Sequence, residues 1–271
     1  MTAQVLIDAF RLPAQALVGQ RIPKKLLVEQ GAPTAADKRL INDTVDELCW
    51  QATLKPGTVG VPASAAASAN AGDATDVIEL AVVSAQLRPP TREAQARRLM
   101  QLVHRAVPYP VLLAVQTPAG TVLSLAQKRS SLGKAGKWVV VDGVETHAFD
   151  PTQPTAAEAQ FMASLSLDQL PPSAVADLRA LYQAVAARVT ALAVAEVTGQ
   201  FKTPEAVAGA ATTGVTAQRG VLAERSQLLD QLASARNTAA KARQMSQRVE
   251  LNLQIQRLQR RLQELQDRLA T

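Results

Sequence analysis

The chain has 271 residues, of which 47% are apolar, 19% charged and 3% aromatic, and its formal net charge is +6. The apolar fraction is sufficient for a sizeable core and excludes wholesale disorder. So few aromatic side chains leave little material for a surface that stacks on nucleic-acid bases. Cys49 is the only cysteine, which excludes an internal disulfide framework and a cysteine-based zinc cluster.

The apolar residues do not form a membrane-spanning pattern. No window of about 18 residues is both apolar and free of charge, so we expect no membrane-spanning helix and no membrane partner. The first residues, MTAQVLIDAFRLP, lack the basic leader and the long apolar run of a secretory signal. We therefore expect a cytoplasmic protein.

Helical and strand-like patterns alternate between residues 34 and 141. Thr34 is a suitable N-cap, and the Thr-Pro-Ala-Gly sequence at 117–120 suits a hairpin turn. The small-residue-rich stretch at 62–72 is interpreted as a flexible connection. The predicted elements are a helix at 34–48, strands at 49–54 and 77–87, a helix at 91–107, and strands at 111–116, 121–126 and 138–141.

This order of elements predicts an α/β (α+β) domain over residues 1–150, with helices on one side of a small mixed or antiparallel sheet. The next region, 151–218, is Ala-rich and predicted to be helical, packing on that domain or extending it. Its main helix is expected at 173–197. Gly209, Gly214 and Gly220 favour a hinge-like connection over 198–220.

Residues 219–271 contain the strongest periodic pattern in the chain. The phase of this pattern shifts between Val249 and Leu251, so we expect one long helix from 219 to 269 with a stutter or kink there. An isolated helix would leave the apolar seam wet, so the seam needs a partner: a second copy, another protein or the chain's own long helix. We favour a coiled coil that mediates association. The seam residues are Leu251, Ile255, Leu258, Leu262, Leu265 and Leu269.

The positive charge is unevenly distributed. Residues 219–271 hold ten basic and five acidic residues, and thus +5 of the net +6. Such asymmetry is typical of contact with nucleic acid or with an acidic partner, although a solvated helical surface can have the same composition. The candidate binding residues are Lys24, Lys25, Arg97, Arg98, Lys128, Arg129, Arg257, Arg260 and Arg261.

The motifs of common enzymes are missing from the sequence. It contains no Gly-x-Ser-x-Gly elbow, phosphate-binding loop or dinucleotide-binding glycine pattern. A restriction-type nuclease would need acids converging near a lysine such as Lys128, but Ala126 stands where an acid is expected. The carboxylates near predicted strands are Asp43, Asp46, Glu47, Asp73, Asp76 and Glu79. The spacing of His104 and His147 does not indicate a metal site. We therefore lean towards a protein without catalytic residues, metal or cofactor.

Several segments, in this order, resemble a family. They are residues 22–27 (Ile-Pro-Lys-Lys-Leu-Leu), 43–50, 104–111 (His-Arg-Ala-Val-Pro-Tyr-Pro-Val), 125–129 (Leu-Ala-Gln-Lys-Arg) and 181–182 (Leu-Tyr). Over roughly residues 5 to 195 the chain is similar to a bacterial family of uncharacterised domains encoded beside superfamily 2 helicases and DNA methyltransferases in restriction-like or phage-defence gene clusters. The resemblance implies an accessory role and supplies no catalytic residues.

Together these observations favour a non-enzymatic accessory subunit of a bacterial DNA-targeting defence system. It would act through a protein partner, a helicase or methyltransferase of the same gene cluster, through self-association of the C-terminal helix, and through weak non-specific contact with DNA. The alternatives are a metal-dependent DNA nuclease subunit with an atypical site and a stand-alone nucleic-acid-binding regulator.

Overall fold

A computed structural model describes residues 2–64, 76–130, 138–206, 212–242 and 244–270. These residues form two compact units, Met1–Val189 and Thr190–Thr271, which we call the head and the tail. The division falls inside a helix, α7 (Leu178–Thr198), and not at the composition changes near residues 150 and 218.

The head is built on a six-stranded sheet whose strands follow one another in chain order. Neighbouring strands are antiparallel except β3 and β4, which are parallel and are connected by α5 (Glu93–Ala106). A parallel pair needs such a crossover, since a tight turn can only reverse the chain. The predicted mixed α+β fold is confirmed. The strands are β1 (Leu17–Arg21), β2 (Val45–Leu54), β3 (Leu80–Leu87), β4 (Val111–Thr117), β5 (Gly120–Ser130) and β6 (Trp138–Glu145).

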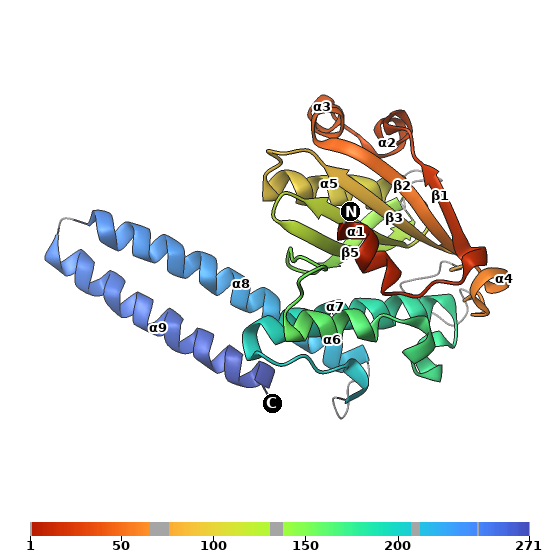
Figure 1. Ribbon diagram of the computed structural model, residues 1–271. Coiled ribbons are helices and arrows are strands. Elements are labelled where there is room, and N and C mark those ends of the chain that lie inside the picture. The colour runs from red at the N-terminus through yellow and green to blue at the C-terminus, as the bar shows by residue number, and fades with distance from the viewer. Residues whose placement is uncertain (1, 65–75, 131–137, 207–211, 243, 271) are drawn as a thin grey trace. The chain divides into compact units, whose positions relative to one another are not determined.

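Helices cover both faces of this sheet, so the expectation of helices on one side is wrong. The core against one face contains Ala81 and Val83 of β3 together with side chains of α2 (Lys24–Gly31), α3 (Ala35–Thr44) and α5. The alternate residues Leu80 and Val82 are also buried, on the other face. There α1 (Thr2–Asp8) contacts β3, β4 and β5 (Figure 1). The unbroken apolar runs in β3 and β4 are the sequence signal of this second layer.

The element boundaries differ from the sequence predictions where sheet packing dominates. Thr34 caps α3 as predicted, its hydroxyl accepting the Asp37 N–H at 3.1 Å, but the helix ends at Thr44. The strand β2 then begins at Val45, because Val45 and Leu48 are buried in the sheet core. The turn at 117–120 is confirmed, with Gly120 at φ 141°. Most of the stretch 62–72 lies outside the described residues.

Several elements were not predicted. These are β1, α1, α2 and the short helix α4 (Pro56–Val59). The predicted helix at 173–197 is replaced at its start by a 3₁₀ turn, Pro172–Val175, and continues as α7. A further helix, α6 (Ala156–Ser164), precedes it.

The tail contains two long helices, α8 (Thr212–Lys241) and α9 (Met245–Ala270), where the sequence predicted one. They run antiparallel as a helical hairpin (Figure 1), and their interhelical contacts include Arg261 on α9 with Glu224 on α8. α8 ends at Lys241 and α9 begins at Met245, so the expected stutter or kink at 249–251 is wrong, because those residues lie inside α9. No glycine or proline marks the end of α8, and the physical reason for the reversal is burial, because folding back lets the α9 seam pack within its own chain.

The predicted hinge at 198–220 is therefore shorter. Gly214 and Gly220 lie inside α8, while Gly209 lies outside the described residues. A 3₁₀ turn at Pro204–Ala206 is the helical restart seen before α8.

Among the described residues, α7 is the one helix long and apolar enough to cross a membrane by length and composition. The most apolar 18-residue window of α7 is 61% buried, and Arg188, within that helix, donates hydrogen bonds to the carbonyls of Ser164 and Ala184. These features are typical of the core helix of a globular domain. The expected absence of membrane contact stays a prediction.

Candidate functional site

Lys128, a predicted binding residue, is directed into the head. Its ammonium Nζ donates to the carbonyls of Val107 at 2.8 Å and Tyr109 at 2.5 Å. Burial lowers the pKa of Lys128 to about 7. The amine thus fixes the Pro-Tyr-Pro segment through which the chain leaves α5, and this contact favours a structural role. The side chain of the neighbouring Arg129 lies outside the described part of the structure.

The side chains of Lys24 and Lys25 differ in their surroundings. The Nζ of Lys24 donates to the Val45 carbonyl, and burial lowers the pKa of Lys24. Lys25 is exposed and makes an ion pair of 3.8 Å with Glu29 one turn along α2. An exposed pair of this kind adds at most about 1 kcal/mol, so Lys25 remains available to a ligand.

Arg97 and Arg98 are engaged with acids of the head. The guanidinium of Arg98 donates two hydrogen bonds to the carboxylate of Asp37, at 2.8 and 3.0 Å. This bidentate ion pair joins α5 to the first turn of α3. These hydrogen bonds are the main cause that lowers the pKa of Asp37 to about 2. Arg97 contacts Glu93 at 2.9 Å and Glu145 at 2.7 Å. Both side chains border a shallow hollow on α5, and their charges are matched.

The groups considered for nuclease or metal chemistry have other partners. Glu79 pairs with Lys55 at 2.9 Å, and Lys128 with the two carbonyls described above. His104 lies 3.0 Å from the Ser124 hydroxyl, and burial lowers its pKa to about 3. His147 contacts Glu158 at 2.6 Å. Within the described ranges, no three His, Cys, Asp or Glu side chains gather as they would around a metal ion.

The charge of the tail concentrates at one end of the hairpin. We call residues 231–260, which span the turn, the hairpin tip. It carries six basic residues against the single acid Glu250, a net charge of +5, whereas 212–230 and 261–271 are each neutral. Because like charges on neighbouring turns repel, this arrangement is costly unless an anion or acidic surface compensates it. The basic residues are Arg236, Lys241, Arg243, Arg248, Arg257 and Arg260.

The three arginines predicted as binding residues of the tail, Arg257, Arg260 and Arg261, differ in whether they form ion pairs. Arg261 bridges the helices: it contacts Glu224 at 2.8 Å and Glu264 at 2.9 Å. Arg257 and Arg260 are exposed and form no ion pair with any other described residue. We therefore place Arg257 and Arg260 in the candidate site and Arg261 in the scaffold of the hairpin.

The predicted seam of α9 is the side that faces α8. Leu265 and Leu269 are buried with Val194 of α7 and Val221 of α8. The other four seam residues, Leu251, Ile255, Leu258 and Leu262, are half-buried in the isolated chain. The seam is thus largely used within the chain, and its role in oligomerisation stays a prediction.

A second apolar row runs along α9 on the side away from this seam. Met245, Val249 and Leu253 are 72%, 51% and 49% exposed and lie four residues apart. Continuing the same face of the helix leads to Arg257 and Arg260. We call these five residues the outer stripe. In the sequence, the phase shift between Val249 and Leu251 is the signal that separates the two rows.

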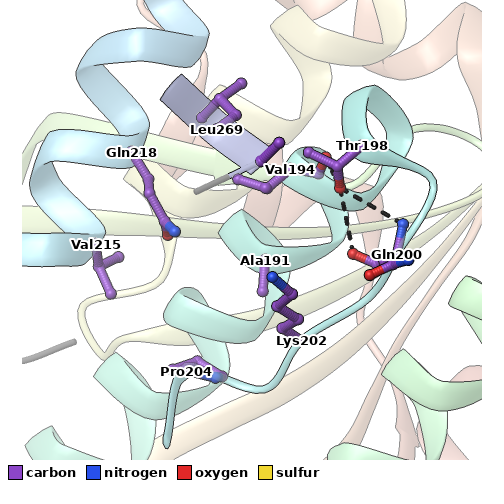
Figure 2. Close-up of a pocket in the computed structure, with 10 residues that line it drawn as sticks. Ala191, Val194, Thr198, Gln200, Lys202, Pro204, Val215, Gln218 and Leu269 are labelled. Carbon is purple, nitrogen blue, oxygen red and sulfur yellow. Dashed lines mark hydrogen bonds between the residues drawn. The ribbon is translucent and has the colours of Figure 1, made fainter. Parts of the chain in front are cut away.

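The tail also contains a cavity of about 290 Å³ between the end of α7, the loop after it, the start of α8 and the end of α9 (Figure 2). Its walls are mostly apolar, and Lys202 is the charged side chain among the described lining residues. The Thr198 hydroxyl lies 3.1 Å from the Val194 carbonyl and 3.3 Å from that of Gln200, so its polar capacity is used locally. This volume lies at the lower limit of ligand pockets, and we assign it no ligand.

The fold and the site together define a mixed α+β head followed by a helical hairpin with a basic, partly apolar tip. The chain belongs to the family described as a domain of unknown function, DUF4391, whose model matches residues 10–262. The family therefore includes most of the hairpin. No curated protein and no solved structure matches the chain.

Proposed function

We propose that this protein is a non-enzymatic accessory subunit of a bacterial DNA-targeting, restriction-like defence system. It would bind a helicase or methyltransferase encoded in the same gene cluster and contact DNA weakly and without sequence preference. The observation that carries the proposal is the hairpin tip, which gathers +5 of the net +6.

The contacts of the head support a structural role for its predicted sites. Lys24, Arg98 and Lys128 each donate to groups of the fold, and Glu79 is neutralised by Lys55. Residues held in this way stabilise a scaffold and are not free to bind phosphate. The exposed arginines of the hairpin tip are then the better candidates for contact with a partner.

The gene-cluster association comes from the family resemblance described above and supplies the class of partner. Family membership over residues 10–262 supports applying that resemblance to the whole chain. An accessory subunit needs a surface for its partner more than it needs a cleft.

The experiment is co-expression of the tagged full chain with the helicase and with the methyltransferase encoded beside its gene. We expect a complex with one of them that survives gel filtration, and that changes the partner's activity on DNA. Neighbouring genes of other kinds, or no complex with either enzyme, would contradict the proposal.

The purified chain is assayed in parallel for turnover of DNA, ATP and S-adenosylmethionine. Turnover that co-purifies through two orthogonal columns and is lost on Glu79→Ala would replace the proposal with the nuclease alternative. Tight DNA binding by the chain alone, with no complex, would favour the stand-alone regulator.

A further inference from the structure

The outer stripe of α9 is an apolar row that continues into unpaired positive charge. Met245, Val249 and Leu253 are about half or more exposed, and Arg257 and Arg260 follow on the same face. From residue 245 to 260 the stripe is about 22 Å long at 1.5 Å per residue, which is about four helical turns. The seam on the opposite side holds the stripe facing outwards.

The chemistry of the stripe limits what can cover it. A DNA backbone would satisfy the arginines but leave the three apolar side chains wet, because it offers phosphates and sugars and no apolar row. A second copy of the hairpin tip would bring +5 against +5 and be repelled. Binding to a lipid surface needs a wide apolar helix face, commonly with an aromatic anchor, whereas the stripe offers three aliphatic side chains.

A helix with an apolar row flanked by acids matches both parts of the stripe. Its leucine-like side chains would pack between Met245, Val249 and Leu253 in the manner of a helix pair. Its carboxylates would reach Arg257 and Arg260, and would meet the positive potential of the remaining basic residues of the tip. We infer that the outer stripe is the docking site for an acidic amphipathic helix of a partner protein.

This inference rests on the proposed function, because it specifies the partner surface that the accessory subunit would recognise. It differs from the coiled-coil prediction in using the side of α9 opposite to the leucine seam. Association through it therefore leaves the α8–α9 hairpin intact.

The test measures binding of the full chain to synthetic helical peptides by fluorescence anisotropy at 50 and 300 mM salt. The probes are a set of peptides with leucines at i, i+3, i+4 and i+7 and glutamates on both flanks, in several registers. One control set has lysines in place of the glutamates, and another has serines in place of the leucines. We expect the acidic amphipathic set to bind and both control sets to fail.

Variants locate the site. Val249→Gln and Leu253→Gln should each weaken binding about fivefold to tenfold, in line with the loss of most of one buried aliphatic side chain. Leu229→Gln is the matched control: Leu229 is a leucine of similar exposure, 40%, on α8. It should change binding less than twofold. Arg257→Gln with Arg260→Gln should reduce the salt dependence of binding.

The remaining outcomes overturn the inference. They are binding of none of the acidic peptides, equal binding of the lysine set, or loss of binding by Leu229→Gln as well as Leu253→Gln. Binding of a 20-bp duplex or of phosphatidylserine vesicles that depends on Val249 and Leu253 would assign the stripe to nucleic acid or lipid. Dimerisation lost on Leu253→Gln would assign it to a second copy. The proposed function fails separately, by the absence of a complex with the helicase or methyltransferase.

Discussion

At the scale of single residues, the head is stabilised by buried polar groups that each have a specific partner. His104 bonds to Ser124, Lys128 to two carbonyls at the exit of α5, and the Tyr182 hydroxyl to the backbone of β4 and β5. Such groups cost stability when their partner is removed, since a buried polar atom then loses its hydrogen bond without regaining water.

Tyr182 allows a direct test of this cost. Its hydroxyl accepts the Ala126 N–H at 2.8 Å and lies 3.0 Å from the Ala126 carbonyl. Tyr182→Phe should lower the free energy of unfolding by about 1–3 kcal/mol, because the N–H of Ala126 is left unpaired. Tyr109→Phe is the control, since no hydrogen bond of its hydroxyl is seen within the described structure. Urea unfolding of both variants gives the comparison, and equal effects would contradict the assignment.

The lowered pKa of His104 predicts that the head becomes less stable as the pH falls. Its pKa is lowered from 6.5 to about 3 by burial, so between these values the unfolded chain binds more protons than the folded one. Stability must therefore fall as pH drops below about 6.5, by up to about 1.4 kcal/mol per pH unit for one group. Asp37, with a pKa of about 2, adds to this only below pH 4.

The variant His104→Asn removes the titrating group and keeps a side chain that can bond to Ser124. We expect a flatter dependence of unfolding free energy on pH between 4 and 6.5 than in the wild type. Unfolding measured at pH 4.5, 5.5, 6.5 and 8 tests this. Parallel pH profiles for the variant and the wild type would mean that another group dominates.

At the scale of elements, the hairpin is held by the inner side of α9 and not by its outer stripe. Leu265 is fully buried, whereas Leu253 on the same helix is 49% exposed. Leu265→Ala should cost about 2–5 kcal/mol, as large-to-small changes in a core do, and should raise amide exchange along α9. Leu253→Ala should leave exchange almost unchanged in the absence of a partner. Hydrogen exchange read by mass spectrometry compares the two variants, and similar effects would show that the helix faces are assigned wrongly.

The ion pairs across the hairpin have a smaller effect. Arg261 and Glu224 are 45% and 39% exposed, so water and salt screen their contact. Removing one partner is expected to cost no more than about 1 kcal/mol. Arg261→Gln can therefore serve as a folded control for variants of the hairpin tip.

At the scale of the whole molecule, DNA affinity should depend on the hairpin tip. With about five phosphate contacts, the logarithm of the affinity should fall with the logarithm of salt at a slope of about −4 to −5. Arg257→Gln with Arg260→Gln should make the slope shallower by about two, while Arg261→Gln should change it little because its charge is already paired. Anisotropy titrations with a duplex and a scrambled duplex measure both slope and preference. A DNA affinity that does not depend on salt, or a strong preference for one duplex, would indicate a sequence-specific DNA-binding surface on the head.

Removal of residues 212–271 should separate the folding of the head from the binding properties of the hairpin. The head keeps its own core, so the shortened protein should unfold cooperatively and remain soluble. It should lose DNA affinity, partner capture and any self-association. Circular dichroism and sedimentation measure these properties, and a shortened protein with unchanged oligomeric state and partners would place the interface on the head.

The sequence by itself determined much of the head. The order of the main elements from α3 to β6, the Thr34 cap, the turn at 117–120 and the mixed α+β class all follow from local patterns, because caps, turns and periodicity act over a few residues. The concentration of positive charge in the tail is also a property of the sequence alone.

Only the tertiary structure decided which charges are free and which side of each element is covered. Lys128, Arg98 and Arg261 are basic residues like Arg257 and Arg260, but each of the three has a hydrogen-bond partner that lies 19 to 61 residues away along the chain. The reversal of direction between the end of α8 and the start of α9 has no local signal, since it is set by the gain from burying Leu265 and Leu269 against α8 and α7. Pairing of distant segments selects among local patterns of similar free energy. For that physical reason, only the folded chain decided which helix covers the second face of the sheet and which row of α9 stays exposed.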